Sequence, residues 1–230
     1  MSPGSPPADP IWLSHELSPE TPAYGGGDSL RVTALTKIAA GDTANTVQLT
    51  LPNHVGTHVD APAHFFEDGA TLSDFPPSAW LFESPVLIDV DVASGSLVEP
   101  QHVSALPEDA DLLLVRTGHG TARGSSHYWE GGPGLSAALA RWLRVERPNV
   151  RAVGMDRISV TTRLDRPAGR EAHRAFLTSE EPGRPILLVE DMDLAGCPLE
   201  LAAVWMAPLL LSGGDGAPIS VMGFPKHPRG

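Results

Sequence analysis

The spacing of apolar residues along the chain predicts many short β-strands. Residues 30–38 and 46–51 alternate apolar with polar side chains, which is the period of half-buried strands that could pair with each other. Residues 85–92 and 110–116 are short apolar runs bounded by turn residues, as buried strands are. Further strands are expected at residues 11–17, 150–155, 185–189 and 202–211.

Helical periodicity is confined to two segments. In residues 135–145 the apolar side chains of Leu135, Leu139, Trp142 and Leu143 recur at three- and four-residue spacing, with Ser136 as a candidate N-cap. A second, short helix is expected at residues 170–177. Strands and helices are mixed throughout, so we predict the α/β class with a mixed sheet rather than a regular βαβ array.

Length and composition favour one domain. The chain has 230 residues, of which 41% are hydrophobic, enough for one well-buried core. Residues 1–10, rich in Pro, Ser and Gly, predict a flexible N-terminal tail, and residues 11–230 a single domain. No stretch approaches the roughly 20 apolar residues that span a bilayer, and the first residues lack a signal-peptide pattern. With a single cysteine, Cys197, the sequence predicts a soluble cytoplasmic protein.

Charge narrows the range of partners. Sixteen basic and 28 acidic residues give a formal net charge of −12. Such a chain repels nucleic acids and anionic membrane surfaces, so we expect neither as a partner.

One short segment concentrates groups that bind metals. His54, His58 and His64 fall within eleven residues, with Asp60 between them. In a straight strand His54 and His58 would lie roughly 13 Å apart, too far for one ion with bonds of about 2 Å. Either the chain bends at Gly56, where a missing Cβ permits positive φ, or the site holds two metals with Asp60 as a shared ligand.

The ligand types indicate which metals fit. Imidazoles with one or two carboxylates suit Zn²⁺ or Mn²⁺, and the lack of nearby cysteine argues against a structural zinc site. Two further candidate ligands lie later in the chain. They are His173, in the predicted short helix, and Glu190, at the end of a predicted buried strand.

The pattern His54-x-Gly-Thr-His58-x-Asp60-x-Pro62-x-His64-Phe65 resembles the signature of the cyclase family, which includes bacterial kynurenine formamidases and isatin hydrolases. Residues 112–118, 153–159, 186–190 and 207–218 resemble later blocks of that family in the same order, so that the likeness covers roughly residues 11–222. The chain departs at Glu190-Asp191, where relatives often carry Glu-Asn. It departs again at residues 25–27, three glycines in an early loop where relatives tend to carry Pro.

The resemblance implies a swivelling β/β/α domain that forms a homodimer or higher homo-oligomer. It further implies one or two divalent ions, Zn or Mn, held by His54, His58, Asp60, His173 and Glu190, with His64 as the catalytic acid/base. The implied reaction is hydrolysis by metal-activated water of a C–N bond in an aryl formamide or related cyclic amide, such as N-formylkynurenine. Phe65, Phe66 and Trp80 are predicted to form an apolar wall for an aromatic or cyclic small-molecule substrate.

Two other functions remain open. The same metal site could serve a cyclase or dehydratase of bacterial secondary metabolism. Alternatively, the chain could be a non-catalytic metal- or ligand-binding protein that keeps the fold alone.

Overall fold

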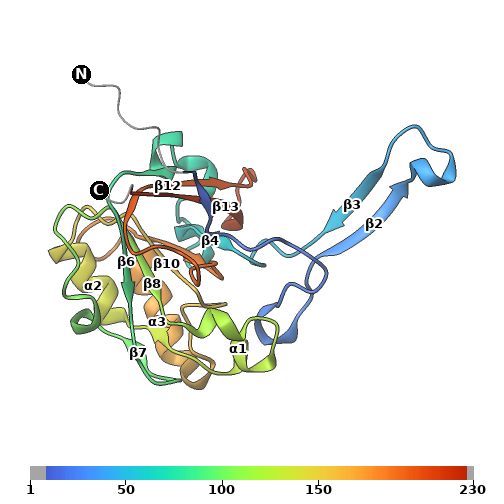
Figure 1. Ribbon diagram of the computed structural model, residues 1–230. Helices are drawn as coiled ribbons and strands as arrows, with labels where there is room; N and C mark the ends of the chain where they lie inside the picture. Colours follow the sequence, from blue (N-terminus) through green and yellow to red (C-terminus); the bar gives the residue numbers. More distant parts are fainter. Residues whose placement is uncertain (1–8, 227–230) are drawn as a thin grey trace.

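A nine-stranded mixed sheet forms the centre of the protein in the computed structural model, which describes residues 9–226 (Figure 1). The part of the predicted tail at residues 1–8 lies outside the described residues. The strand order is β5-β12-β13-β4-β11-β10-β8-β6, and β1 pairs with β13. The bounds are β1 (Ile11–Trp12), β4 (His58–Asp60), β5 (Leu81–Phe82), β6 (Pro85–Asp89), β8 (Leu112–Arg116), β10 (Ala152–Met155), β11 (Leu187–Glu190), β12 (Leu201–Pro208) and β13 (Gly216–Pro225).

The sheet has a parallel half and an antiparallel half, which meet between β11 and β4. Strands β6, β8, β10 and β11 run parallel to one another, whereas β4 is antiparallel to both β11 and β13. Strand β12 also contacts β6, so the sheet curls toward a barrel. Short β7 (Leu97–Val98) and β9 (Gly134–Leu135) form a separate parallel pair.

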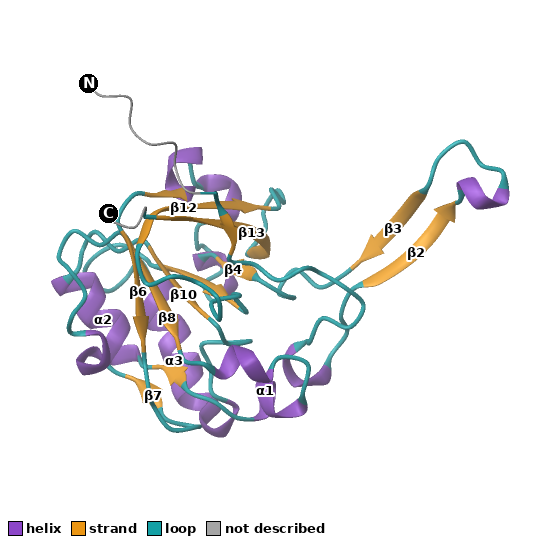
Figure 2. Cartoon of the chain, viewed as in Figure 1, coloured by secondary structure: helices purple, strands orange, loops and turns teal. Residues whose placement is uncertain are grey.

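Alternate residues of the central strands face two cores. Leu112 and Leu114 of β8 point into the core inside the curled sheet, and Leu113 and Val115 point into the core under the helices. The helices are α1 (Ser126–Glu130), α2 (Ala137–Glu146) and α3 (Arg166–Leu177), and α2 packs beside α3 (Figure 2). The predicted α/β class with a mixed sheet is confirmed.

Local signals account for the helix ends. The Ser136 side chain accepts a hydrogen bond of 3.0 Å from the Leu139 amide, so Ser136 caps α2 as its sequence position predicts. Helix α3 begins at Arg166, earlier than expected, because Asp165 caps it and Pro167 suits its first turn.

Among residues 9–226, no helix combines the length and apolar character needed to cross a lipid bilayer.

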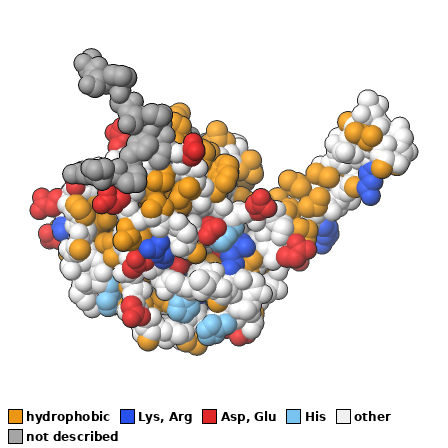
Figure 3. All heavy atoms as spheres, in the orientation of Figure 1, with side chains coloured by type: hydrophobic (Ala, Val, Ile, Leu, Met, Phe, Trp, Pro, Cys, Tyr) orange, Lys and Arg blue, Asp and Glu red, His pale blue; other side chains and the backbone are white. Residues whose placement is uncertain are grey.

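Strands β2 (Arg31–Thr36) and β3 (Thr46–Thr50) pair with each other as predicted, but the expectation that they are half-buried is wrong. They form a hairpin that projects from the body, with apolar side chains along its length (Figures 1 and 3). Every residue of both strands except Thr36 is exposed. The alternation of apolar residues predicts two faces of a ribbon, but it does not determine whether the chain's own core covers one of them.

Candidate metal centre

Four ionisable side chains meet where the two halves of the sheet join. His58 and Asp60 lie at alternate positions of β4 and therefore share one face. Glu190, the last residue of β11, pairs with His58 in the ladder, and His173 approaches from α3. All four are 5% exposed or less. The sequence thus brings together His58, Asp60, His173 and Glu190, which we call the inner cluster.

Backbone carbonyls orient both imidazoles of the inner cluster. The Nδ1 atom of His58 lies 2.8 Å from the Gly56 carbonyl, and that of His173 lies 2.8 Å from the Gly169 carbonyl. An Nδ1–H that donates to a carbonyl leaves Nε2 with its lone pair free. This is the tautomer that a metal ligand requires, held as metal-binding histidines usually are.

The spacing of the free atoms fits a cation. His58 Nε2 lies 3.3 Å from a Glu190 oxygen and 3.5 Å from an Asp60 oxygen, and His173 Nε2 lies 3.4 Å from Glu190 and 3.8 Å from Asp60. Metal bonds of about 2.0–2.2 Å in a tetrahedron separate neighbouring ligand atoms by roughly 3.3–3.6 Å. Two buried carboxylates also need a compensating charge. His58, Asp60 and Glu190 offer ligand atoms within 4.8 Å of one another, close enough to hold a divalent ion, and His173 approaches the other oxygens of the two carboxylates.

The electrostatics of the inner cluster reflect this concentration of charge. Burial by itself lowers the pKa of His58, but the hydrogen bond to Glu190 and the charges of Asp60 and Glu190 outweigh it and raise the pKa to about 9. Burial raises the pKa of Glu190, but the histidines His173 and His58 outweigh that and lower it. The two carboxylates thus favour positive charge on the imidazoles beside them, as they would favour a bound cation.

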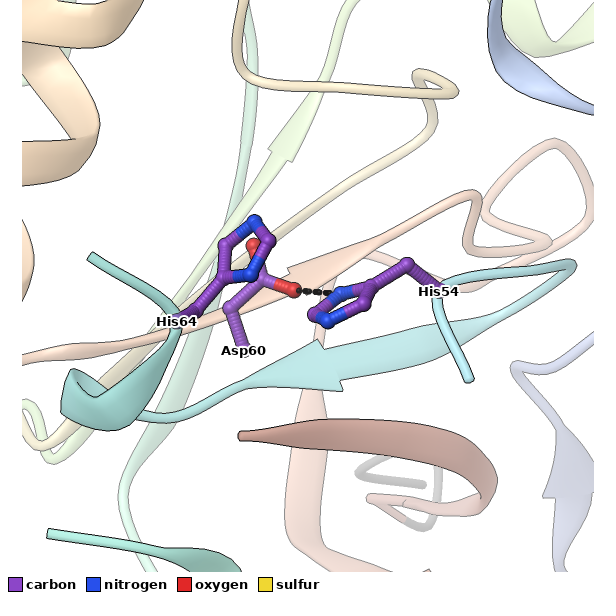
Figure 4. Close-up of side chains that lie close together, drawn as sticks. All are labelled: His54, Asp60 and His64. Atoms are coloured by element: carbon purple, nitrogen blue, oxygen red, sulfur yellow. Dashed lines mark hydrogen bonds and ion pairs between the residues drawn. The ribbon is translucent and has the colours of Figure 1, made fainter. Parts of the chain in front are cut away.

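A second group adjoins the inner cluster and shares Asp60 with it (Figure 4). His54 Nδ1 lies 2.8 Å from Asp60 and its Nε2 lies 2.8 Å from Asp215. His64 Nδ1 lies 3.0 Å from the same Asp215 oxygen, and the rings of His54 and His64 are 4.0 Å apart between centroids. The nitrogen and oxygen ligand atoms of His54, Asp60 and His64 are close enough together to hold a metal. We call His54, His64 and Asp215 the outer group.

A turn at Gly56 brings His54 back toward β4. Gly56 has φ +64°, in the left-handed region, and a Cβ there would collide with the Leu17 side chain. The bend expected from the reach of the two histidines is therefore present. Asp60 lies between both groups, in the position expected of a shared ligand.

Both groups open into a cavity of about 470 Å³, within the range of small-molecule sites. Of the three aromatic residues predicted to contact substrate, Phe65 lines the cavity and stacks on His173 with ring centroids 4.8 Å apart. Phe66 packs against the helix-side core instead, and Trp80 is buried beside Phe75 in the other core. Neither lies at the cavity, because the chain turns away through the short helix that ends at His64.

Asp215 of the outer group was not predicted from the sequence, and neither were the cavity-lining residues Tyr24, Ser159, Thr161, Arg166 and Arg170. Asp215 holds both histidines of the outer group, and Ser159 donates a hydrogen bond of 3.1 Å to Glu190. The sequence feature that could have indicated Asp215 is its position between Gly214 and Gly216. A glycine is needed at position 216 because a Cβ there would collide with the His54 ring.

The structure accounts for Asp191, where relatives often carry Asn. Asp191 has φ +52°, which aspartate tolerates better than most residues. Its carboxylate accepts hydrogen bonds from Arg123, at 2.7 Å, and from the Tyr128 hydroxyl, so its charge is paired. Its carbonyl accepts from Thr57, next to His58. Asp191 thus supports the segment that follows Glu190 and does not line the cavity.

Comparisons with known proteins concern the family and the fold of the chain. The family model Cyclase matches residues 11–162. Cyclase-like protein 1 of Arabidopsis thaliana is 29% identical over 214 residues, which cover 90% of this chain and 81% of that protein. Isatin hydrolase A from Labrenzia aggregata, solved with benzyl benzoate, superposes with a TM-score of 0.76 and 21% identity over 94% of this chain and 93% of that one. A structure described as a "predicted metal-dependent hydrolase" from Bacillus stearothermophilus superposes with a TM-score of 0.71 and 22% identity. The match covers 94% of this chain and 98% of that one.

Proposed function

The chain belongs to the cyclase family, and from that premise we propose that it is a metal-dependent hydrolase that cleaves a C–N bond of an aryl formamide or a related cyclic amide. The observation that carries the proposal is the position of His64, beside a cluster suited to a divalent ion and in the same cavity. Hydrolase names among the solved relatives, isatin hydrolase included, support the reaction type.

The residues divide into those that hold the ion and those that move protons. With one or two Zn²⁺ or Mn²⁺ ions bound to His58, Asp60, His173, Glu190 and His54, the ion supplies Lewis acidity and activates water for attack on a carbonyl. The inner cluster is buried while the outer group is partly exposed, so substrate enters from the side of the outer group. Phe65 provides an apolar face for an aromatic ring.

His64 is placed to handle the protons of the reaction. Its Nδ1 lies 3.0 Å from Asp215, so the carboxylate accepts the Nδ1–H and fixes the orientation of the ring. Nε2 is then free to take a proton from the attacking water and to deliver it to nitrogen. An anilide nitrogen leaves poorly unless it is protonated, so this delivery is required for C–N cleavage.

The test is turnover by the purified protein loaded with Zn²⁺ or Mn²⁺. We expect hydrolysis of at least one of N-formylkynurenine, isatin and formanilide, with a product mass one water above that of substrate. Absence of turnover on all three contradicts the proposal. A product that has lost water would instead identify a cyclase or dehydratase.

We also propose a cytoplasmic location. Cys197, the only cysteine, is a buried free thiol, and burial raises its pKa to about 11. An unreactive thiol without a disulfide suits a reducing compartment.

A further inference from the structure

Two arginines of α3 line the cavity and have no protein carboxylate to pair with. Arg166 and Arg170 both line it together with His173. Among residues 9–226, neither guanidinium lies within 4.0 Å of a carboxylate oxygen, and neither donates a hydrogen bond. What distinguishes these two arginines is their place at the cavity, in a chain whose 28 acidic residues outnumber its 16 basic ones.

Some arginines of the described chain pair with acids, whereas others, such as Arg31 and Arg163, do not. Arg116, Arg123, Arg141 and Arg151 each form an ion pair with Asp or Glu. The acidic residues next to Arg166 and Arg170 in the sequence have other partners. Asp165 accepts a hydrogen bond from the Ala168 amide, and Glu171 forms an ion pair with Arg141. The two guanidiniums at the cavity therefore remain free for a ligand.

Helix geometry places the two guanidiniums on the side of the reacting groups. Residues 166, 170 and 173 follow four- and three-residue spacing and form one stripe along α3. The backbone of Arg170 is about 4.5 Å along the axis from that of His173, and Arg166 is about 10.5 Å from it. His173 is buried whereas both arginines are exposed, so the stripe runs from the floor of the cavity to its mouth. The Arg166 guanidinium also lies 5.9 Å from the ring centroid of Tyr24, which flanks the mouth.

We propose that Arg166 and Arg170 bind a carboxylate carried by the substrate at the end remote from the scissile C–N bond. Guanidinium groups match carboxylates in shape and charge, and Phe65 and Tyr24 flank the intervening ring. The arginines thereby select anionic amides over neutral ones. This inference rests on the proposed function for the identity of the bond, while the carboxylate selection can be measured without turnover.

The test uses two probes that differ by one carboxylate group: 4-formamidobenzoate, with a carboxylate para to the formamide, and neutral formanilide. Calorimetric titration of metal-free protein is expected to give about tenfold tighter binding of 4-formamidobenzoate, a difference that falls as salt rises. Substituting both arginines, Arg166→Gln with Arg170→Gln, reduces the preference to within about twofold. The matched control Arg174→Gln removes a charge from the same helix, where Arg174 lies over Phe66 away from the cavity, and leaves the preference unchanged.

The outcomes separate this inference from the proposed reaction. If the wild-type protein binds both probes equally, or if the preference survives the double substitution, the carboxylate site is wrong whether or not the probes are hydrolysed. If the preference is present and depends on the two arginines but neither probe is hydrolysed by the metal-loaded protein, the site stands and the proposed reaction fails. In the metal-loaded protein the same preference is expected in kcat/KM.

Discussion

His58 and Glu190 are directly paired residues of the antiparallel strands β4 and β11, and His58 Nε2 lies 3.3 Å from a Glu190 oxygen. Side chains of paired residues project from the same face of a sheet, so the register of this ladder alone brings the two groups together. Asp60, two residues along, joins the same face, and α3 adds His173. The centre is therefore built into the junction of the two sheet halves rather than into mobile loops.

The protons held by the metal-free centre predict a pH dependence of stability. The folded-state pKa of His58, about 9, lies above the unfolded value of 6.5, so its contribution is fully present below pH 6.5 and is lost as the pH rises through about 9. The loss is at most roughly 3 kcal/mol for His58. Urea unfolding of metal-free protein between pH 6 and pH 9.5 measures it. His58→Gln should flatten the decline, and an unchanged decline in that variant would show that His58 is not its source.

His64 is predicted to affect turnover without affecting metal binding. His64→Gln should retain the wild-type metal content and lower kcat about 10²–10⁴-fold, the usual contribution of a general acid/base. Metal analysis and steady-state kinetics on the same preparation measure the two effects. If this variant turns over at the wild-type rate, another residue transfers the proton. If neither protein is active, the result favours a protein that binds metal without catalysis.

Gly216 is predicted to be required for the position of His54. In Gly216→Ala the added Cβ would collide with the His54 ring and lie 2.8 Å from the Val59 carbonyl, so we expect a loss of about 1–3 kcal/mol in unfolding free energy. A misplaced His54 should also lower kcat/KM by up to about 10²-fold. The control is Gly196→Ala, because nothing lies within 4 Å of a Cβ at Gly196. Equal thermal melting of the two variants would contradict the predicted collision.

Much of the centre was predictable because its signals are local. The histidine-rich segment contains its own bend at Gly56, and Glu190 ends a recognisable buried strand. The cap at Ser136 and the period of α2 follow from side chains within one turn of each other. For such features, the interacting residues lie close together in the sequence.

Features that depend on distant packing were not predictable. Strand β13 contains Gly216, Pro218 and Gly223, which obscure its alternation, so neither the strand nor Asp215 beside it was predicted. Trp80 lies near the motif in sequence but is buried in the core, because proximity along the chain does not determine direction. The exposure of the hairpin formed by β2 and β3 likewise depends on which surfaces the rest of the chain covers.

The most direct test of the account is the metal content of the protein beside that of Asp60→Asn, a change that keeps the shape of the shared ligand but removes its charge. After incubation with Zn²⁺ or Mn²⁺ and dialysis, elemental analysis should find one or two ions per wild-type chain, and circular dichroism should show both proteins folded. We predict that Asp60→Asn retains less than about a tenth of the wild-type metal, since ligand carboxylates contribute strongly to affinity. A folded wild-type protein without metal, or an Asp60→Asn variant with the full complement, would contradict the assignment of this centre.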